Sequence, residues 1–147
     1  MIFFFHDVSM ACINQAAVAN AVPAELILAI ITVEGGRNGI AMPNKNGTFD
    51  LGVMQINTSW QDAIAQKRYT LNDIRYDSCE NIKFGTWILD QCIKNNSDLD
   101  EAIGDYHSHT PVFNTEYSQK VLKDYQYIHK MLYPVTSPYC KKTGQIC

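Results

Sequence analysis

The sequence predicts one α+β domain that is mostly helical and carries a small β-hairpin. Apolar residues recur at helical spacing along most of the chain, and Asn46-Gly47 is a strong signal for a hairpin turn. The 147 residues, 46% of them hydrophobic and 18% charged, suffice for one globular domain with an ordinary core. We expect residues 10–133 to form this domain, between an N-terminal segment, 1–9, and an irregular cysteine-containing tail, 134–147.

Two packed helices are predicted at the start of the domain. Residues 10–21 form a short helix with alanines along its inner side. Pro23 suits the first position of the second helix, because its missing N–H would have no helical partner there. The second helix ends at Glu34, because Gly35-Gly36 readily adopts the left-handed conformation that closes a helix.

The middle of the chain is predicted to change from extended structure back to helix. Residues 38–57 hold the expected strands, as a ribbon of two or three strands around the hairpin turn. Thr58 or Ser59 can cap a short helix that runs to about Gln66. Ser78 then starts the longest amphipathic helix. Because a glycine inside a helix costs stability, Gly85 indicates close packing, which we expect against the helix that ends at Glu34.

Two further helices complete the predicted domain. One opens at Ser97-Asp-Leu-Asp100, where acidic residues favour the positive end of the helix dipole, and closes within residues 106–111. The last runs from Thr115 to about Leu132. Its predicted inward residues are Tyr117, Val121, Tyr125, Ile128 and Leu132.

Glu34 is the first candidate for catalysis. At helical spacing it shares a face with the branched aliphatics Ile27, Ile30 and Ile31. Such surroundings disfavour a charged carboxylate and raise its pKa, so the group can stay protonated near neutral pH and act as an acid. The alternative is a structural carboxylate, either solvated in the last turn or held in an ion pair.

A polar segment follows the hairpin and supplies candidate ligand contacts. Gln55 and Asn57 alternate with Met54 and Ile56, which is too polar a pattern for a plain core strand. A carboxamide both donates and accepts hydrogen bonds, so it suits sugar hydroxyls and acetamido groups. The segment therefore favours a glycan as the substrate.

Four motifs, in order, resemble the soluble lytic transglycosylase group of the lysozyme-like superfamily. They are Glu34-Gly-Gly-Arg-Asn38, Asn46-Gly-Thr-Phe-Asp-Leu-Gly-Val-Met-Gln-Ile-Asn57, Cys79-Glu-Asn-Ile-Lys-Phe-Gly85 and Ala102-Ile-Gly-Asp-Tyr-His-Ser108. The resemblance covers residues 10–132 and is closest to the small single-domain members that accompany type IV secretion, conjugation and pilus machines. It implies a lysozyme-like domain with the hairpin beside the active-site cleft.

The resemblance also implies a reaction. Glu34 would act first as acid and then as base on the β-1,4 bond between MurNAc and GlcNAc in peptidoglycan. The substrate's own N-acetyl group and the muramyl 6-hydroxyl would replace a second carboxylate and water, which gives a 1,6-anhydroMurNAc product. No cofactor or metal is expected. The candidate substrate-binding residues are Met54, Gln55, Asn57, Tyr106 and Tyr117.

Asp50 is the candidate second carboxylate in the motif region. As a base it would make the protein a hydrolase of the lysozyme type, whereas the interpretation we favour is that it braces the hairpin. Gly35 departs from the family, in which a serine usually follows the catalytic glutamate, so water or Arg37 would have to orient the acid. Loss of that hydroxyl leaves open a non-catalytic subunit that only binds glycan strands.

The histidines of Tyr106-His-Ser-His109 stand where the family usually has Tyr-Asn-Ala-Gly. Two histidines could suggest a metal site, but no third ligand is near them in the sequence. We interpret His107 and His109 as residues of the cleft rim or of a loop. This form of the motif resembles the secretion-associated subgroup.

The five cysteines predict disulfide bonding in part. Cys79 and Cys92 share one predicted helix, about 20 Å apart, so they cannot pair with each other. The family resemblance makes Cys12 and Cys79 the first candidate pair. Cys92, Cys140 and Cys147 then leave one thiol over, which we do not assign. The alternative is that all five are reduced.

Charge and apolar runs restrict the partners and the location. A net charge of −3 gives no basic surface for nucleic acid, and no apolar run approaches the 18 residues of a membrane span. Peptidoglycan strands are the expected substrate, and components of a secretion, conjugation or pilus machine are candidate partners. We expect a periplasmic or otherwise exported protein. The first ten residues do not read as a signal peptide, so the export signal would lie outside this chain. A phage-borne lysin is a further alternative.

Overall fold

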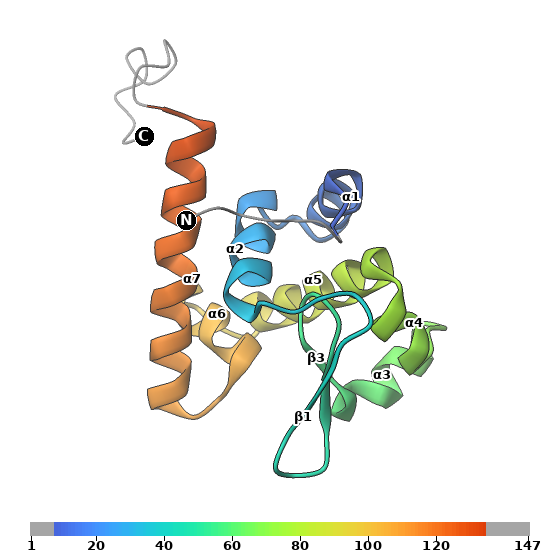
Figure 1. Cartoon of the computed structure of the whole chain (residues 1–147). Helices are drawn as coiled ribbons and strands as arrows, with labels where there is room; N and C mark the ends of the chain where they lie inside the picture. The colour runs from blue at the N-terminus through green and yellow to red at the C-terminus, as the bar shows by residue number, and fades with distance from the viewer. Residues whose placement is uncertain (1–7, 135–147) are drawn as a thin grey trace.

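The computed structural model describes residues 8–134 of the chain, and within them it is mostly helical with one small sheet (Figure 1). This confirms the predicted α+β class. The elements are α1 (Met10–Asn20), α2 (Ala24–Glu34), β1 (Ala41–Pro43), β2 (Phe49–Leu51), β3 (Ile56–Asn57), the 3-10 turn η1 (Thr58–Trp60), α3 (Gln61–Gln66), α4 (Leu71–Tyr76), α5 (Ser78–Lys94), α6 (Leu99–His107) and α7 (Pro111–Leu132).

The helices form a body in which α2 is enclosed by its neighbours. The long helix α7 runs along α2 and α6, while α1 packs on α5 (Figure 1). Six consecutive residues of α2, from Leu26 to Ile31, are buried. A helix that is apolar on every side belongs in the interior. The buried stretch ends three residues before Glu34, so the acid lies half-buried at the edge of the core.

The ends of α2 follow the signals in the sequence. Pro23 directly precedes the helix, in an extended conformation, rather than occupying its first position. Gly35 closes the helix in the left-handed conformation, with φ of +64°, and its N–H donates to the Ile31 carbonyl. The predicted stop at Gly35 is therefore confirmed, and the predicted place of Pro23 is wrong by one residue.

The sheet has three antiparallel strands in the order β1-β2-β3. Met42 pairs with Asp50, and Asp50 pairs with Asn57, so β2 and β3 carry polar side chains beside one another. The turn between β1 and β2 contains Gly47 at φ of +84°, as the Asn46-Gly47 signal predicts. The hairpin of β1 and β2 projects from the helical body (Figure 1).

Asn57, rather than Thr58 or Ser59, caps the structure that follows the sheet. Its side-chain oxygen accepts a hydrogen bond of 2.9 Å from the Ser59 N–H, and a 3-10 turn leads into α3. The predicted end at Gln66 is confirmed. The cap differs from the prediction because an asparagine in extended conformation is at least as good a cap as serine or threonine.

The short helix α4 was not predicted. Thr70 and Asp73 form a capping box, in which each side chain accepts a hydrogen bond from the other's backbone N–H. This spacing, a threonine followed three residues later by an acid, is a sequence signature of a helix start. The signal was present, but six residues give too short an apolar pattern for a periodicity argument.

The helix α7 begins at Pro111, four residues before the predicted start at Thr115. Proline is favoured in the first helical turn, where its missing N–H needs no partner, so Pro111 explains the earlier start. Of the predicted inward residues Tyr117, Val121 and Ile128 are buried, whereas Leu132 is 53% exposed. The last turn of α7 therefore extends beyond the core.

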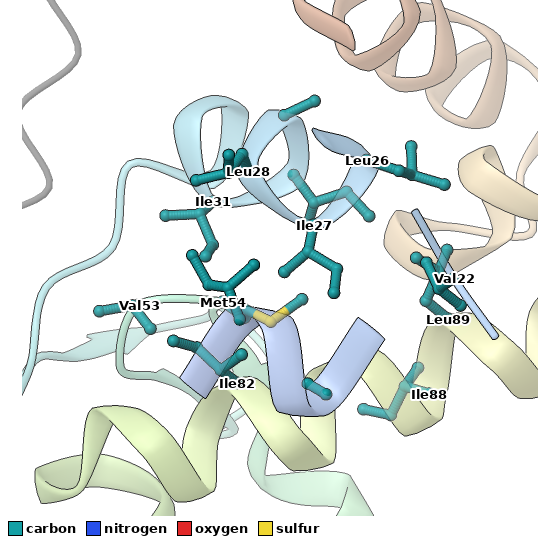
Figure 2. Close-up of a cluster of buried hydrophobic side chains, with 14 of the residues drawn as sticks. Val22, Leu26, Ile27, Leu28, Ile31, Val53, Met54, Ile82, Ile88 and Leu89 are labelled. Atoms are coloured by element: carbon teal, nitrogen blue, oxygen red, sulfur yellow. The ribbon is translucent and has the colours of Figure 1, made fainter. Parts of the chain in front are cut away.

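Met54 lies in the core, between α2 and α5. Its side chain is fully buried and packs with Ile27 and Ile82 (Figure 2). A Cβ atom at Gly85 would lie 2.6 Å from the Met54 sulfur, so this glycine makes room for Met54 and not for α2, as we had expected. Two predictions are corrected: the packing partner of Gly85 and the place of Met54 in the cleft wall.

A disulfide joins Cys12 in α1 to Cys79 at the start of α5, with Cα atoms 5.4 Å apart. The first-choice pairing is confirmed. Cys92 is a free, half-buried thiol on α5, and burial raises its pKa to about 11. The remaining cysteines, Cys140 and Cys147, and the predicted irregular tail lie outside the described residues.

Loss of this disulfide should destabilise the domain by about 2–5 kcal/mol, because a bond that spans 67 residues restricts the unfolded chain strongly. The variant Cys12→Ala/Cys79→Ala, unfolded in urea, measures the effect. Cys92→Ala is the matched control and should stay within about 1 kcal/mol of the native protein, since that thiol is only half-buried. Equal stability of native and double-variant proteins would contradict the expected role of the bond.

No single helix within residues 8–134 has the length and apolar composition to cross a membrane. The helices α1 and α2 meet both criteria only when they are taken together, and they bend by 119° at the break between them.

Candidate active site

A cleft of about 860 Å³ lies beside Glu34, and we call it the main cleft. Its walls come from the end of α2, the hairpin, the β3–η1 segment, α5 and the connection between α6 and α7. The side chains that line it include Glu34, Asp50, Gln55, Asn57, Trp60 and Tyr106. Polar groups and aromatic rings thus surround the carboxyl group, a combination that fits a glycan.

Glu34 keeps its proton to a large extent at neutral pH, where an ordinary glutamate is fully ionised. Burial disfavours its charged form and raises its pKa to about 7, the charge of Asp50 adds to the rise, and the Tyr117 hydroxyl opposes it. Among residues 8–134 no basic side chain forms an ion pair with it. The lack of an ion pair among these residues excludes the alternative of an ion-paired structural carboxylate. The effect of burial confirms the predicted rise in the pKa of Glu34.

Tyr117 lies behind the acid rather than on the open face of the cleft. Its ring is 5% exposed and is stacked on His107, with centroids 4.7 Å apart, and beside Tyr106. Its hydroxyl interacts with the Glu34 carboxyl but makes no hydrogen bond of standard geometry. A ring covered in this way offers little surface to a sugar, so the place of Tyr117 suits holding the acid.

Tyr106 lines the main cleft and anchors the segment below it. Its hydroxyl donates a hydrogen bond of 2.9 Å to the Met54 carbonyl, while the Met54 N–H donates to the buried Asn81 side chain at 2.9 Å. Burial and the nearby Glu34 carboxyl raise the pKa of Tyr106 well above its ordinary value, so it stays neutral. The Met54 backbone is thereby held at both its N–H and its carbonyl.

Gln55 is the carboxamide that is available to a ligand. It occupies a left-handed conformation with φ of +52°, and its side-chain nitrogen donates to the Gly52 carbonyl at 2.9 Å. Its side-chain oxygen has no hydrogen-bond partner among the described residues. Gly36 permits this arrangement, because a Cβ atom there would collide with the Gly52 carbonyl.

Asn57 is largely committed to holding the hairpin together. Its side-chain nitrogen donates to Thr48 at 3.0 Å and to one oxygen of Asp50 at 2.9 Å, and its oxygen caps η1 through Ser59. The side chain lines the main cleft, but its polar atoms already have partners. Asp50 keeps its second oxygen free within the described region and faces the same cleft.

The histidines after Tyr106 lie at the rim of the main cleft, as predicted. His107 stacks on Tyr117, and His109 lies 3.3 Å from an oxygen of Asp105. Within residues 8–134 no three histidine, cysteine or acidic side chains gather as a metal site would require. Both histidines are thus lining residues of the main cleft.

Gly35 leaves open space where the family has a serine. No atom lies within 4 Å of a Cβ built at this position. The hydroxyl that interacts with Glu34 comes instead from Tyr117, and Arg37 is exposed and does not contribute to the pKa of the acid. We had expected water or Arg37 to orient the Glu34 carboxyl group in place of the serine. The Tyr117 hydroxyl can do so instead.

Replacement of Tyr117 by phenylalanine should raise the pKa of Glu34 further, because the hydroxyl now favours the charged form. Activity that depends on protonated Glu34 should then decline at a higher pH than in the native protein. The pH profile of kcat/KM measures this shift. Tyr76→Phe is the control, since Tyr76 is exposed and does not line the cleft. An unchanged or lower pKa in Tyr117→Phe would contradict the assignment.

A helical body, a hairpin beside the cleft and one buried proton donor define a lysozyme-like enzyme that acts on glycans. Residues 11–128 match the Transglycosylase SLT domain, and the chain belongs to this family. Members of the family are peptidoglycan lytic transglycosylases, and the substrate is therefore the peptidoglycan of the cell wall.

The chain is also similar to a set of Salmonella proteins. Invasion protein IagB of Salmonella typhi is 26% identical over 125 residues, which cover 82% of this chain and 78% of that protein. Invasion protein IagB of Salmonella typhimurium, strains SL1344 and LT2, shows the same identity and coverage. The similarity extends over most of both chains and not only over the four motifs.

Proposed function

We propose that this enzyme cleaves the β-1,4 bond between MurNAc and GlcNAc and leaves a 1,6-anhydroMurNAc end. The observation that carries the proposal is Glu34, an acid with a pKa of about 7 in a cleft where the Gln55 side-chain oxygen has no partner among the described residues. A single carboxyl group of this pKa can donate a proton and then take one back near neutral pH. That double use is what a transglycosylase with one catalytic carboxylate requires.

The reaction proceeds in two steps. In the first, Glu34 protonates the glycosidic oxygen, the bond from that oxygen to the muramyl C1 breaks, and the carbonyl oxygen of the muramyl N-acetyl group bonds to C1. In the second, the Glu34 carboxylate removes the proton of the 6-hydroxyl, whose oxygen attacks C1 and displaces the acetamido oxygen. The proton returns to Glu34, and no water is consumed.

The residues around Glu34 have separate roles in this scheme. Gln55, whose side-chain oxygen is unpaired, binds the sugar's N–H or hydroxyl groups. Trp60 offers an aromatic face at the cleft, in contact with Phe84 and Trp87 behind it. Asn57 acts mainly through the hairpin, because its polar atoms are bonded to Thr48, Asp50 and Ser59.

The second candidate is a hydrolase in which Asp50 activates water, and one observation favours it: Asp50 faces the main cleft with one free oxygen. Mass spectrometry of fragments released from purified sacculi separates the two. A product that is one water lighter than the hydrolytic fragment supports the transglycosylase. A reducing end at every cut would overturn it.

The variant Asp50→Asn sharpens that test. In the transglycosylase it should leave the anhydro product unchanged and lower the pKa of Glu34, since the charge of Asp50 raises it. The pH at which activity declines then falls. In a hydrolase the same variant would lose most of its activity at every pH, because the base is gone.

We further propose that the enzyme acts outside the cytoplasm and opens the wall locally for a secretion, conjugation or pilus assembly. The relatives' name, invasion protein, supports a role in such a process. Deletion of the gene, with complementation by the native chain or by Glu34→Gln, tests it. Assembly of the machine should require the active chain, and equal rescue by both chains would count against the proposal.

A further inference from the structure

A smaller cavity of about 170 Å³ borders the main cleft at the catalytic acid, and we call it the side pocket. Glu34, His107 and Phe113 line both cavities, so the two lie next to each other with these residues between them. The rest of the side pocket comes from Val33 at the end of α2 and from one face of α7. The mechanism above uses none of the residues that line only this pocket, apart from Tyr117.

The side pocket combines apolar walls with one ammonium group, Lys120, and one carboxylate besides Glu34, that of Glu116. Val33 and Phe113 supply the apolar surface, while Glu116 and Lys120 stand one helical turn apart on α7. Within residues 8–134 neither charged group has an ion-pair partner, in contrast to Lys83 and Lys94 on α5. An unpaired ammonium beside the catalytic acid is therefore available to an anionic ligand.

The substrate carries an anionic substituent, the stem peptide, which extends from the muramyl sugar close to Glu34. In peptidoglycan the stem peptide is attached through a lactyl group to the muramyl sugar, whose C1 bond is the one that Glu34 protonates. The peptide therefore departs within about one sugar ring of the acid. Its free carboxyl groups have pKa values of about 3.3–4.3, so they are charged at neutral pH. Its alanyl and lactyl methyl groups are apolar.

We propose that the side pocket binds the stem peptide of the muramyl residue, with Lys120 paired to a peptide carboxylate. This inference rests on the proposed function, because it takes the muramyl sugar to lie at Glu34. Phe113 and Val33 contact the methyl groups of the peptide, and Glu116 accepts from its N–H groups. Lys120 is thus a specificity-determining residue, which favours glycan strands with peptides over strands with other substituents.

The test compares two substrates that differ only in charge: peptidoglycan strands with intact stem peptides, and the same strands after their carboxyl groups are converted to amides. An exposed ion pair is worth up to about fivefold in binding. Native enzyme should therefore have a kcat/KM about two- to fivefold higher on the intact strands. Lys120→Met should reduce the value on intact strands to the value on amidated strands, and Lys120→Arg should retain the difference.

Lys123→Met is the matched control, because Lys123 lies on the same helix and lines neither cavity. It should keep the native preference. The proposal is overturned if native enzyme cleaves both substrates equally well, or if Lys120→Met keeps the preference for intact strands. A general loss of charge on α7 would instead affect Lys120→Met and Lys123→Met alike, which also counts against the pocket.

A binding measurement separates this proposal from the proposed reaction. The inactive variant Glu34→Gln, titrated by calorimetry with intact or amidated glycan oligomers, should bind the intact oligomers two- to fivefold more tightly, and the added change Lys120→Met should remove that difference. If native enzyme yields no anhydro product, the reaction scheme fails, while the calorimetric comparison still decides whether the peptide is bound. Equal affinity for both oligomers would overturn the peptide site alone.

Discussion

Glu34→Gln should reduce the release of anhydromuropeptides by at least about 10²- to 10⁴-fold, the contribution that a positioned acid and base makes to a rate. The amide has nearly the same shape as the acid but cannot donate a proton to the glycosidic oxygen. Initial rates on purified sacculi measure the loss. Activity of the variant within tenfold of the native enzyme would reject Glu34 as the catalytic residue.

The same variant should be more stable than the native protein above neutral pH. The pKa of Glu34 is raised from 4.5 to about 7 on folding, so the folded state holds its proton more tightly than the unfolded chain. Its contribution to stability is fully present below pH 4.5 and is lost as the pH rises to about 7. A buried neutral amide avoids this loss, which amounts to as much as about 3 kcal/mol.

Urea unfolding at pH 4 and at pH 8 tests this prediction. The variant and the native protein should be similar at the lower pH, and the variant should be the more stable at the higher pH. This result would also show that the loss of activity is not a loss of fold. A variant that is less stable at pH 8 would contradict the burial of Glu34.

Asn81→Leu should destabilise the domain by about 3–5 kcal/mol. Asn81 is completely buried, donates to the Leu51 and Ile74 carbonyls at 2.8 and 2.9 Å, and accepts from the Met54 N–H. Leucine has a similar volume but leaves three buried backbone groups without partners, and each costs about 1–3 kcal/mol. Chemical denaturation of the purified variant measures the loss.

The control for Asn81 is Asn72→Leu, since Asn72 is exposed on α4 and should tolerate the change within about 0.5 kcal/mol. A second readout comes from the cleft. The Met54 peptide that Asn81 holds precedes Gln55, so any folded Asn81→Leu protein should show a raised KM for glycan. Native-like stability and KM together would remove Asn81 from the support of the site.

Much of the fold could be predicted from local patterns. The stop of α2 at Gly35, the hairpin turn at Gly47 and the start of α5 at Ser78 each depend on a few neighbouring residues, and all three are confirmed. The helix α4 escaped prediction because it has only six residues. The predicted start of α7 is too late because residues 106–111 are assigned to the close of the preceding helix, although proline is favoured in a first helical turn and α7 begins at Pro111.

The candidate site could be predicted by residue type, but the sequence does not show in which direction each side chain points. Met54 and Asn57 belong to the expected segment, yet the Met54 side chain is buried in the core. The Asn57 side chain is hydrogen-bonded to residues of the hairpin. Both outcomes depend on contacts with residues far along the chain. Asn81 gave a signal that we did not use: it is an asparagine on the buried face of an amphipathic helix, where a polar group needs partners.

The disulfide between α1 and α5 makes the stability of the domain depend on the redox state of its surroundings. Disulfides persist in oxidising compartments and are rare in the cytosol. With both thiols reduced, the unfolded chain loses the restriction that the bond between Cys12 and Cys79 imposes on it, and the domain resists unfolding less. The domain should therefore be most robust where thiols are oxidised.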